Sequence, residues 1–99
     1  MQARLWTYLP NGVLSDDGAF EFSGMDRTSY LVRMGGVVAI VEAENFSDEA
    51  GGVAAFHLPE DQEVQTIDGP RQITASERQT AIEFIRAAAP LLDRRPVFQ

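Results

Sequence analysis

One amphipathic helix constrains the fold of this chain more than any other feature of the sequence. Thr74-Ala75-Ser76-Glu77 has the pattern of a capping box, in which the Thr74 hydroxyl accepts from the Glu77 amide and the Glu77 carboxylate accepts from the Thr74 amide. Apolar residues then recur at three- and four-residue steps, at Ala81, Ile82, Ile85, Ala88, Ala89 and Leu92. Pro90 predicts that the helix ends or kinks at about Ala89. Since a lone helix of about 16 residues cannot bury such a stripe, it has to pack on another element.

The residues before this helix are predicted to form a sheet. Ala19–Ser23 alternates two phenylalanines with a glutamate, which is typical of a half-buried strand. Thr28–Met34 and Val37–Glu44 are the strongest strand patterns, and Gly35-Gly36 between them suits a two-residue antiparallel hairpin. The nearly continuous apolar run Val37–Val41 indicates a central strand covered on both faces. The other expected strands are Arg4–Leu9, Val53–Leu58 and Val64–Ile67.

Polar and turn-forming segments separate these strands. Asn45–Gly52 is polar and acidic and predicts a loop, whereas Glu60–Glu63 predicts a charged turn. Asp68-Gly69-Pro70 predicts a further break in the chain. Arg94–Phe98 could form a short edge strand, where proline is tolerated. We therefore predict one α+β domain over residues 1–99, with an antiparallel sheet of about five to six strands and one C-terminal helix packed on one face.

The charges are distributed unevenly along the chain. Residues 1–70 hold twelve acidic residues against three arginines, a net charge of about −9, whereas residues 71–99 hold three acidic residues against five arginines, or about +2. A domain this acidic repels nucleic acid and anionic membranes and attracts basic proteins or cations. The charge distribution therefore favours a binding function with a basic partner over a chemical reaction.

Several classes of function are excluded or disfavoured by composition. The chain has no cysteine, which excludes disulfides, thiolate metal sites and cysteine nucleophiles. No apolar run approaches the roughly 20 residues that span a bilayer. The first six residues lack the apolar core of a signal peptide. We therefore expect a cytoplasmic protein with no membrane and no nucleic acid among its partners.

A few side chains could carry chemistry, but each has a simpler interpretation. His57 is the single histidine and could act as a general base, although without a nearby Ser or Cys motif it is more often a strand-end residue. Glu42 and Glu44 share one face of a strand about 7 Å apart and could act as acid and base. With Asp48 and Glu49 they could instead hold a divalent cation. A solvated surface, or one that receives Arg and Lys from a partner, is the favoured interpretation, and no cofactor or metal is predicted.

Two stretches of the sequence carry a longer pattern. The first has an aromatic residue, a glycine turn and a hydrophobic strand that closes on glutamate: Tyr30, Gly35-Gly36, Val37–Val41 and Glu42 or Glu44. The second has a strand end, a turn, a helix cap and an apolar helix: Ile67-Asp68-Gly69-Pro70, Ile73, Thr74, Glu77-Arg78 and Ile82–Ile85. Over roughly residues 28–98 this pattern resembles a family of small bacterial immunity proteins from polymorphic toxin systems, with Ile67 where the family tends to have tryptophan.

The resemblance implies a mostly-β immunity domain with a C-terminal helix that neutralises the toxin encoded next to it. Such a protein acts by occupying the toxin, so the resemblance implies no catalytic residue. It agrees with the charge, because nuclease toxins are basic and an acidic inhibitor associates with them rapidly through electrostatic steering.

The leading hypothesis is an immunity-type protein that binds a cognate toxin through an acidic surface, and the toxin is expected to be basic, for example a nuclease. The expected contact residues lie in two segments whose ends could converge at one sheet edge, with Phe46 as the buried anchor: Glu42, Glu44, Phe46, Asp48, Glu49, Glu60, Asp61 and Glu63. One alternative is a phage-encoded acidic inhibitor of another nucleic-acid-handling complex. Another is a small enzyme built on Glu42, Glu44 and His57. The strand expected at Arg4–Leu9 could also pair two copies into a homodimer.

Overall fold

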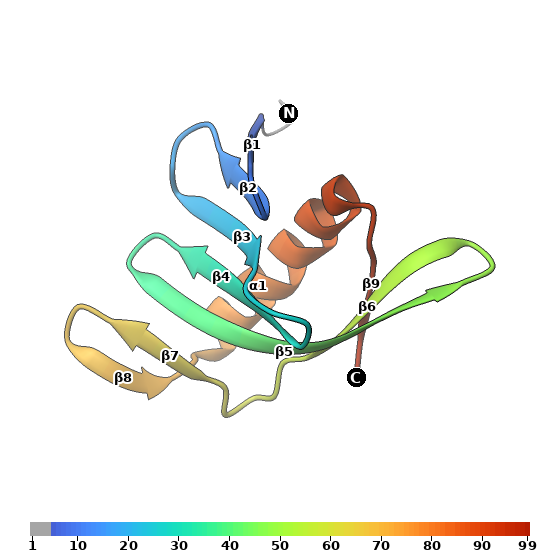
Figure 1. Cartoon of the computed structure of the whole chain (residues 1–99). Helices are drawn as coiled ribbons and strands as arrows, with labels where there is room; N and C mark the ends of the chain where they lie inside the picture. Colours follow the sequence, from blue (N-terminus) through green and yellow to red (C-terminus); the bar gives the residue numbers. More distant parts are fainter. Residues whose placement is uncertain (1–4) are drawn as a thin grey trace.

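Strands make up most of the computed structural model, which describes residues 5–99, and one helix packs against them (Figure 1). In chain order the elements are β1 (Trp6–Leu9), β2 (Gly12–Ser15), β3 (Phe20–Gly24), β4 (Ser29–Met34), β5 (Val37–Asp48), β6 (Gly51–His57), β7 (Glu63–Thr66), β8 (Gly69–Gln72), α1 (Ala75–Ala88), the 3-10 turn η1 (Ala89–Leu92) and β9 (Arg95–Phe98). The α+β class predicted from the sequence is confirmed. Arg4, the first residue of the strand expected at Arg4–Leu9, lies outside the described residues.

All the strands of the described segment belong to one branched sheet. The main order is β1-β2-β3-β4-β5-β6-β9, and β7 pairs with the first half of β5 and carries β8 on its other side. Every pairing is antiparallel except β6 with β9, which is parallel. The prediction of five to six antiparallel strands is therefore wrong in both count and direction, since residues 5–99 form nine strands in a mixed sheet. The long connection through β7, β8 and α1 is what lets β9 return parallel to β6.

The two strands that the sequence did not predict, β2 and β8, both begin at a glycine. In β2, Gly12 approaches β3 so closely that a Cβ atom at this position would lie 2.6 Å from the Ser23 Cα, so close packing requires a glycine here. In β8, Pro70 pairs with Gln65 on an edge strand, where its missing N–H costs no ladder hydrogen bond. The break expected at Asp68-Gly69-Pro70 is therefore a hairpin turn with a strand beginning at its glycine.

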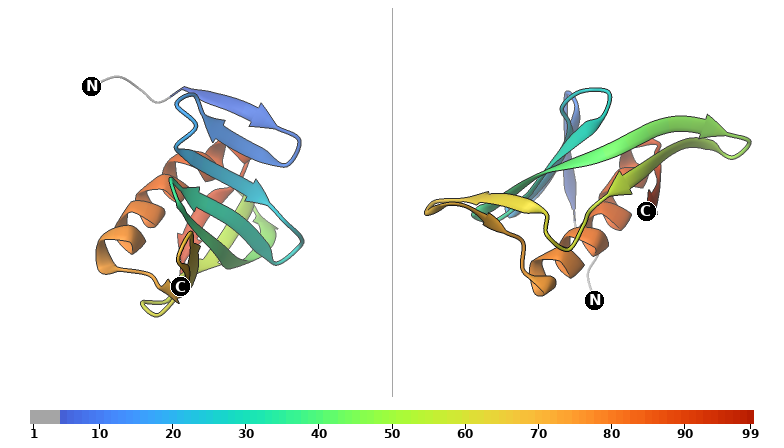
Figure 2. Two further views of the ribbon diagram at one scale, coloured as in Figure 1. Left: turned by 90° about the vertical axis from the view of Figure 1, so that its left-hand side faces the viewer. Right: turned by 90° about the horizontal axis from the view of Figure 1, so that it is seen from below.

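Strand β5 differs most from its predicted form. It extends beyond Glu44 to Asp48 and pairs there with β6, so the loop expected at Asn45–Gly52 is wrong: these residues form most of a projecting β-hairpin (Figure 1). Backbone pairing, which the polarity of the side chains does not reveal, stabilises this segment. The prediction that Val37–Val41 is covered on both faces is also wrong, because Ile40 is 43% exposed and α1 covers one face only (Figure 2).

Other predicted elements are confirmed at their expected places. Met34 pairs with Val37 across Gly35-Gly36, and Gly35 adopts the positive φ of 59° that such a tight hairpin requires. Arg95–Phe98 is an edge strand that contains a proline, as expected. The strand predicted at Val64–Ile67 is displaced by one residue, since β7 ends at Thr66 and leaves Ile67 98% exposed in the hairpin turn.

The hydrophobic core lies between α1 and the face of the sheet on which α1 packs. In Figure 1, α1 lies behind the sheet. The predicted stripe is buried along α1, and the α-helix ends at Ala88 before Pro90 in η1. The pattern omitted Phe84, which is buried and stacks on Trp6 with 5.4 Å between ring centroids. On the sheet, the rings of Phe22, Tyr30 and Phe56 pack against one another and complete the core.

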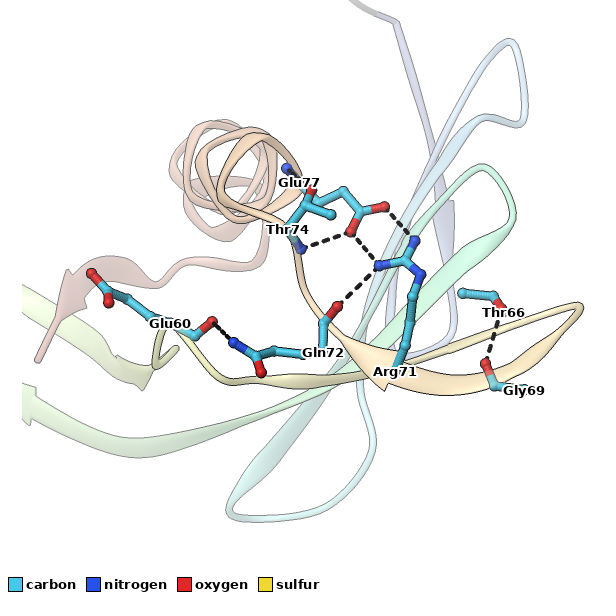
Figure 3. Close-up of polar contacts among 7 residues, drawn as sticks. All are labelled: Glu60, Thr66, Gly69, Arg71, Gln72, Thr74 and Glu77. Carbon is cyan, nitrogen blue, oxygen red and sulfur yellow. Dashed lines mark hydrogen bonds and ion pairs between the residues drawn. The ribbon is translucent and has the colours of Figure 1, made fainter.

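The capping box at the start of α1 is present and is joined by an arginine from β8 (Figure 3). The Thr74 amide donates to the Glu77 carboxylate at 3.0 Å, and the Glu77 amide donates to the Thr74 hydroxyl at 3.1 Å. Arg71 donates to both oxygens of the same carboxylate, at 2.7 and 2.8 Å. The hydrogen bonds from Arg71, and then that from the Thr74 amide, lower the pKa of Glu77 to about 2. Glu77 therefore ties the β7–β8 hairpin to the helix.

We expect Glu77→Gln to destabilise the fold at neutral pH but not in strong acid. The amide keeps an acceptor for Thr74 and removes the charge that binds Arg71. Since the folded-state pKa lies below the ordinary value of 4.5, the carboxylate contributes stability that is complete above pH 4.5 and is lost as pH falls toward 2. The parent should therefore exceed the variant by about 0.5–1 kcal/mol in unfolding free energy at pH 7. Urea denaturation across this pH range measures the difference, and a difference independent of pH would contradict the assignment.

Candidate interaction surface

The face of the sheet opposite α1 is not covered by any element of residues 5–99 (Figure 2). Side chains alternate along β5, so that Ala39, Val41 and Ala43 enter the core. The intervening side chains point to the other side of the sheet, and from Ile40 onward they are exposed. They are Val38, Ile40, Glu42, Glu44 and Phe46. We call this side of the sheet the open face.

Three of the predicted contact residues lie on the open face along β5. The register places Glu42 opposite His57, Glu44 opposite Ala55 and Phe46 opposite Val53. Glu42 and Glu44 are exposed, and neither forms a hydrogen bond or ion pair with another side chain of residues 5–99. Phe46 is 45% exposed. Alternation along a strand therefore sets the shared orientation of these three side chains, as the sequence predicted for the two glutamates.

Three further predicted residues, Glu60, Asp61 and Glu63, lie in the connection from β6 to β7 and at the start of β7. Gln62 holds this connection against β5, because its side-chain amide donates to the backbone carbonyls of Ile40 and Glu63, each at 3.1 Å. The Glu60 carbonyl accepts a longer hydrogen bond, 3.4 Å, from the side chain of Gln72 (Figure 3). These contacts place Glu63 beside the middle of β5 and close to the open face.

The last two predicted residues, Asp48 and Glu49, lie at the far end of the β5–β6 hairpin. Asp48 is six residues beyond Glu42 on the same strand, a distance of about 20 Å. Arg95 of β9 donates to the Asp48 carboxylate, and this hydrogen bond lowers the pKa of Asp48. The structure thus divides the predicted contact residues between the middle of the sheet and the hairpin end.

His57, Glu42 and Glu44 line a common shallow hollow of about 440 Å³, together with Arg27 and Gln99. Within the described chain, the His57 side chain forms no hydrogen bond with either glutamate, so no partner orients the imidazole as a general base requires. No group of three or more histidine, aspartate or glutamate side chains in residues 5–99 is arranged to hold a metal ion. In the described residues, the hollow therefore brings His57, Glu42 and Glu44 together without a hydrogen bond between them.

The sequence-based interpretation missed the apolar side chains of the open face. Leu31 of β4 lies directly opposite Ile40, and Val38 lies on the same face of β5. Leu14 lies on this face too, in β2, which is separated from β4 by β3. All but Ile40 are half-buried. The pattern did contain this information, since strict alternation from Val37 onward would have put Val38 and Ile40 on the face that also bears Glu42. The apolar run obscured it.

Comparison with known proteins does not assign this chain to a family. No protein-family model, no curated protein and no solved structure matches the chain. In the described part of the chain, the single α-helix is too short and too polar to cross a membrane.

Proposed function

We propose that this protein is an immunity-type inhibitor that binds and neutralises a cognate bacterial toxin in the cytoplasm, without chemistry of its own. One observation carries the proposal. Five exposed carboxylates, three on the open face and two in the connection from β6 to β7, form no ion pair or side-chain hydrogen bond within residues 5–99: Glu42, Glu44 and Glu63, and Glu60 and Asp61. Their charge is available to a partner.

Three other carboxylates of the described chain are neutralised internally by arginines, whereas these five are not. Glu77 binds Arg71, Asp48 binds Arg95, and Glu21 lies 3.7 Å from Arg33. An unpaired carboxylate in water costs the fold little and contributes little to it. A group of them around one surface does raise the local negative potential, which accelerates association with a basic protein. A basic toxin, such as a nuclease, has the complementary charge.

Coexpression with the product of the neighbouring gene tests the proposal, which expects that product to be a basic nuclease toxin. We expect growth to be restored, nuclease activity to be lost in purified mixtures, and the two chains to elute together in a stoichiometric complex. His57→Ala should protect as well as the parent, since neutralisation by occupancy requires no general base. Loss of protection in His57→Ala with the complex still formed would favour an enzyme. A complex with a different nucleic-acid-handling assembly, and none with the toxin, would favour the anti-defence inhibitor.

A further inference from the structure

The open face has an apolar centre where β4 and β5 lie side by side. Leu31 and Ile40 are directly opposite each other in the register, and Val38 follows on the same face of β5. Ile40 is 43% exposed, and the other two are half-buried. We call these three residues the open-face patch. An isoleucine exposed to this extent beside two further apolar side chains is the kind of contact that a partner can desolvate.

Carboxylates border the open-face patch. Glu42 is the next outward residue after Ile40 along β5, and Glu63 lies beside Ile40 because Gln62 binds the carbonyls of both residues. On the β3 side of the patch, Glu21 lies opposite Arg33, which in turn lies opposite Val38. Glu21 pairs with Arg33, so these two side chains add no net charge to the border. An apolar centre with a polar border is the common anatomy of protein interfaces.

The β5 backbone is held more firmly at Ile40 than at the hairpin. On one side of Ile40, β4 pairs with β5, and on the other side Gln62 and β7 contact it. Beyond Glu42 the pairing with β4 ends, so Phe46 has a neighbouring strand on the β6 side only. Binding residues on rigid elements lose less conformational entropy on association. The anchor of the surface is therefore expected at Ile40 and not at Phe46.

We propose that the open-face patch receives an apolar side chain from a basic protein surface, whose Lys or Arg residues pair with Glu42 and Glu63. Charge complementarity selects this occupant, because the chain carries a net charge of −7 and the side chains of Glu42 and Glu63 have no partners within residues 5–99. The same charge repels nucleic acid and anionic membranes. The inference rests on the proposed function for its partner class and specifies which residues anchor that partner.

Two synthetic peptides of 14 residues test the inference without any toxin. One alternates lysine with leucine and the other alternates lysine with serine, so their charge is the same. The lysine–leucine peptide should bind at least about tenfold more tightly, as expected where an apolar contact is buried. In a nuclear magnetic resonance titration, the largest amide shifts should fall around Leu31 and Ile40. Equal affinities, or shifts centred on the β5–β6 hairpin end, would overturn the inference.

Single substitutions locate the anchor. Ile40→Ser should reduce the affinity of the lysine–leucine peptide to that of the lysine–serine peptide. Ile67→Ser is the matched control, because Ile67 is 98% exposed at the β7–β8 turn and should make no difference. A loss in Phe46→Ser or Ile67→Ser as large as in Ile40→Ser would overturn the inference. Denaturation midpoints check the folds, and Ile40→Thr, which keeps the β-branched shape, repeats the test if Ile40→Ser is destabilised.

The peptide test separates the anchor from the proposed function. If the peptides respond as expected but the coexpressed toxin is not neutralised, the toxin is the wrong partner and the open-face patch remains a binding surface. If the toxin is neutralised but the two peptides bind equally, the protein is an inhibitor that uses another anchor.

Discussion

Replacing Phe56 with alanine should lower the free energy of unfolding by about 3–5 kcal/mol. Phe56 is fully buried on β6, and its ring lies 5.2 Å from that of Tyr30, 5.9 Å from Phe22 and 5.7 Å from Phe98. It thus contacts rings from β3, β4 and β9, which reach the core from both sides of β6. Alanine at this position would leave a cavity, because the three strands that carry these rings cannot all move inward to fill it. Urea denaturation, with the midpoint and slope both fitted, measures this loss.

Phe46→Ala is the matched control, since the chemical change is identical and the side chain is 45% exposed on the β5–β6 hairpin. We expect it to cost under about 1 kcal/mol. Similar losses in the two variants would mean that Phe56 does not occupy the centre of the core, and the parallel pairing of β6 with β9 would then also be in doubt.

Reversing three charges of the open face should slow association with a basic toxin by about 10- to 100-fold at low salt. Glu42→Lys, Glu44→Lys and Glu63→Lys together change the charge of this surface by six units without entering the core. Because such border charges guide the encounter, the dissociation rate should change much less than the association rate. Binding of the parent should also weaken as salt rises from about 0.05 to 0.5 M, where the Debye length falls from about 14 to 4 Å. Stopped-flow measurements at several salt concentrations resolve both effects.

The control is a triple reversal of equal charge at exposed positions in the β2–β3 turn, the β7–β8 turn and α1: Asp16→Lys, Asp68→Lys and Glu83→Lys. If the position of the charge matters, this control should associate nearly as fast as the parent. Equal slowing in both triple variants would show that net charge alone steers the encounter and that the open face is not the binding surface.

Local patterns in the sequence predicted the local elements well. The capping box and the apolar stripe of α1 act within a few residues of chain, and so does the glycine pair between β4 and β5. Strands β2 and β8 could not be recognised, because each is only four residues long, begins at a glycine and has no clear alternation of polar and apolar residues, so that its stability comes from backbone pairing with the neighbouring strand. The same reason explains the Asn45–Gly52 segment, whose polar side chains belong to a hairpin that projects into solvent.

For the candidate surface, the sequence predicted which face of β5 each side chain points to, but not which residues of other segments lie beside it. Period-two alternation puts Glu42 and Glu44 on one face without any knowledge of the fold. That Glu63 lies beside Ile40 depends on one glutamine side chain, Gln62, whose role no pattern indicates. The open-face patch was missed because the run of five apolar residues predicted a strand covered on both faces, which obscured the alternation that continues into Glu42 and Glu44.

The alternation along β5 also has an evolutionary consequence. Its inward residues Ala39, Val41 and Ala43 are packed against the core, whereas Ile40, Glu42 and Glu44 contact little of it. If the open face binds a partner as proposed, selection for folding and selection for that partner act on different residues of the same strand. The outward positions can drift, or diversify toward a new partner, while the inward positions keep the fold unchanged. In a strand of this kind, binding specificity can change through the outward positions without a loss of folding stability.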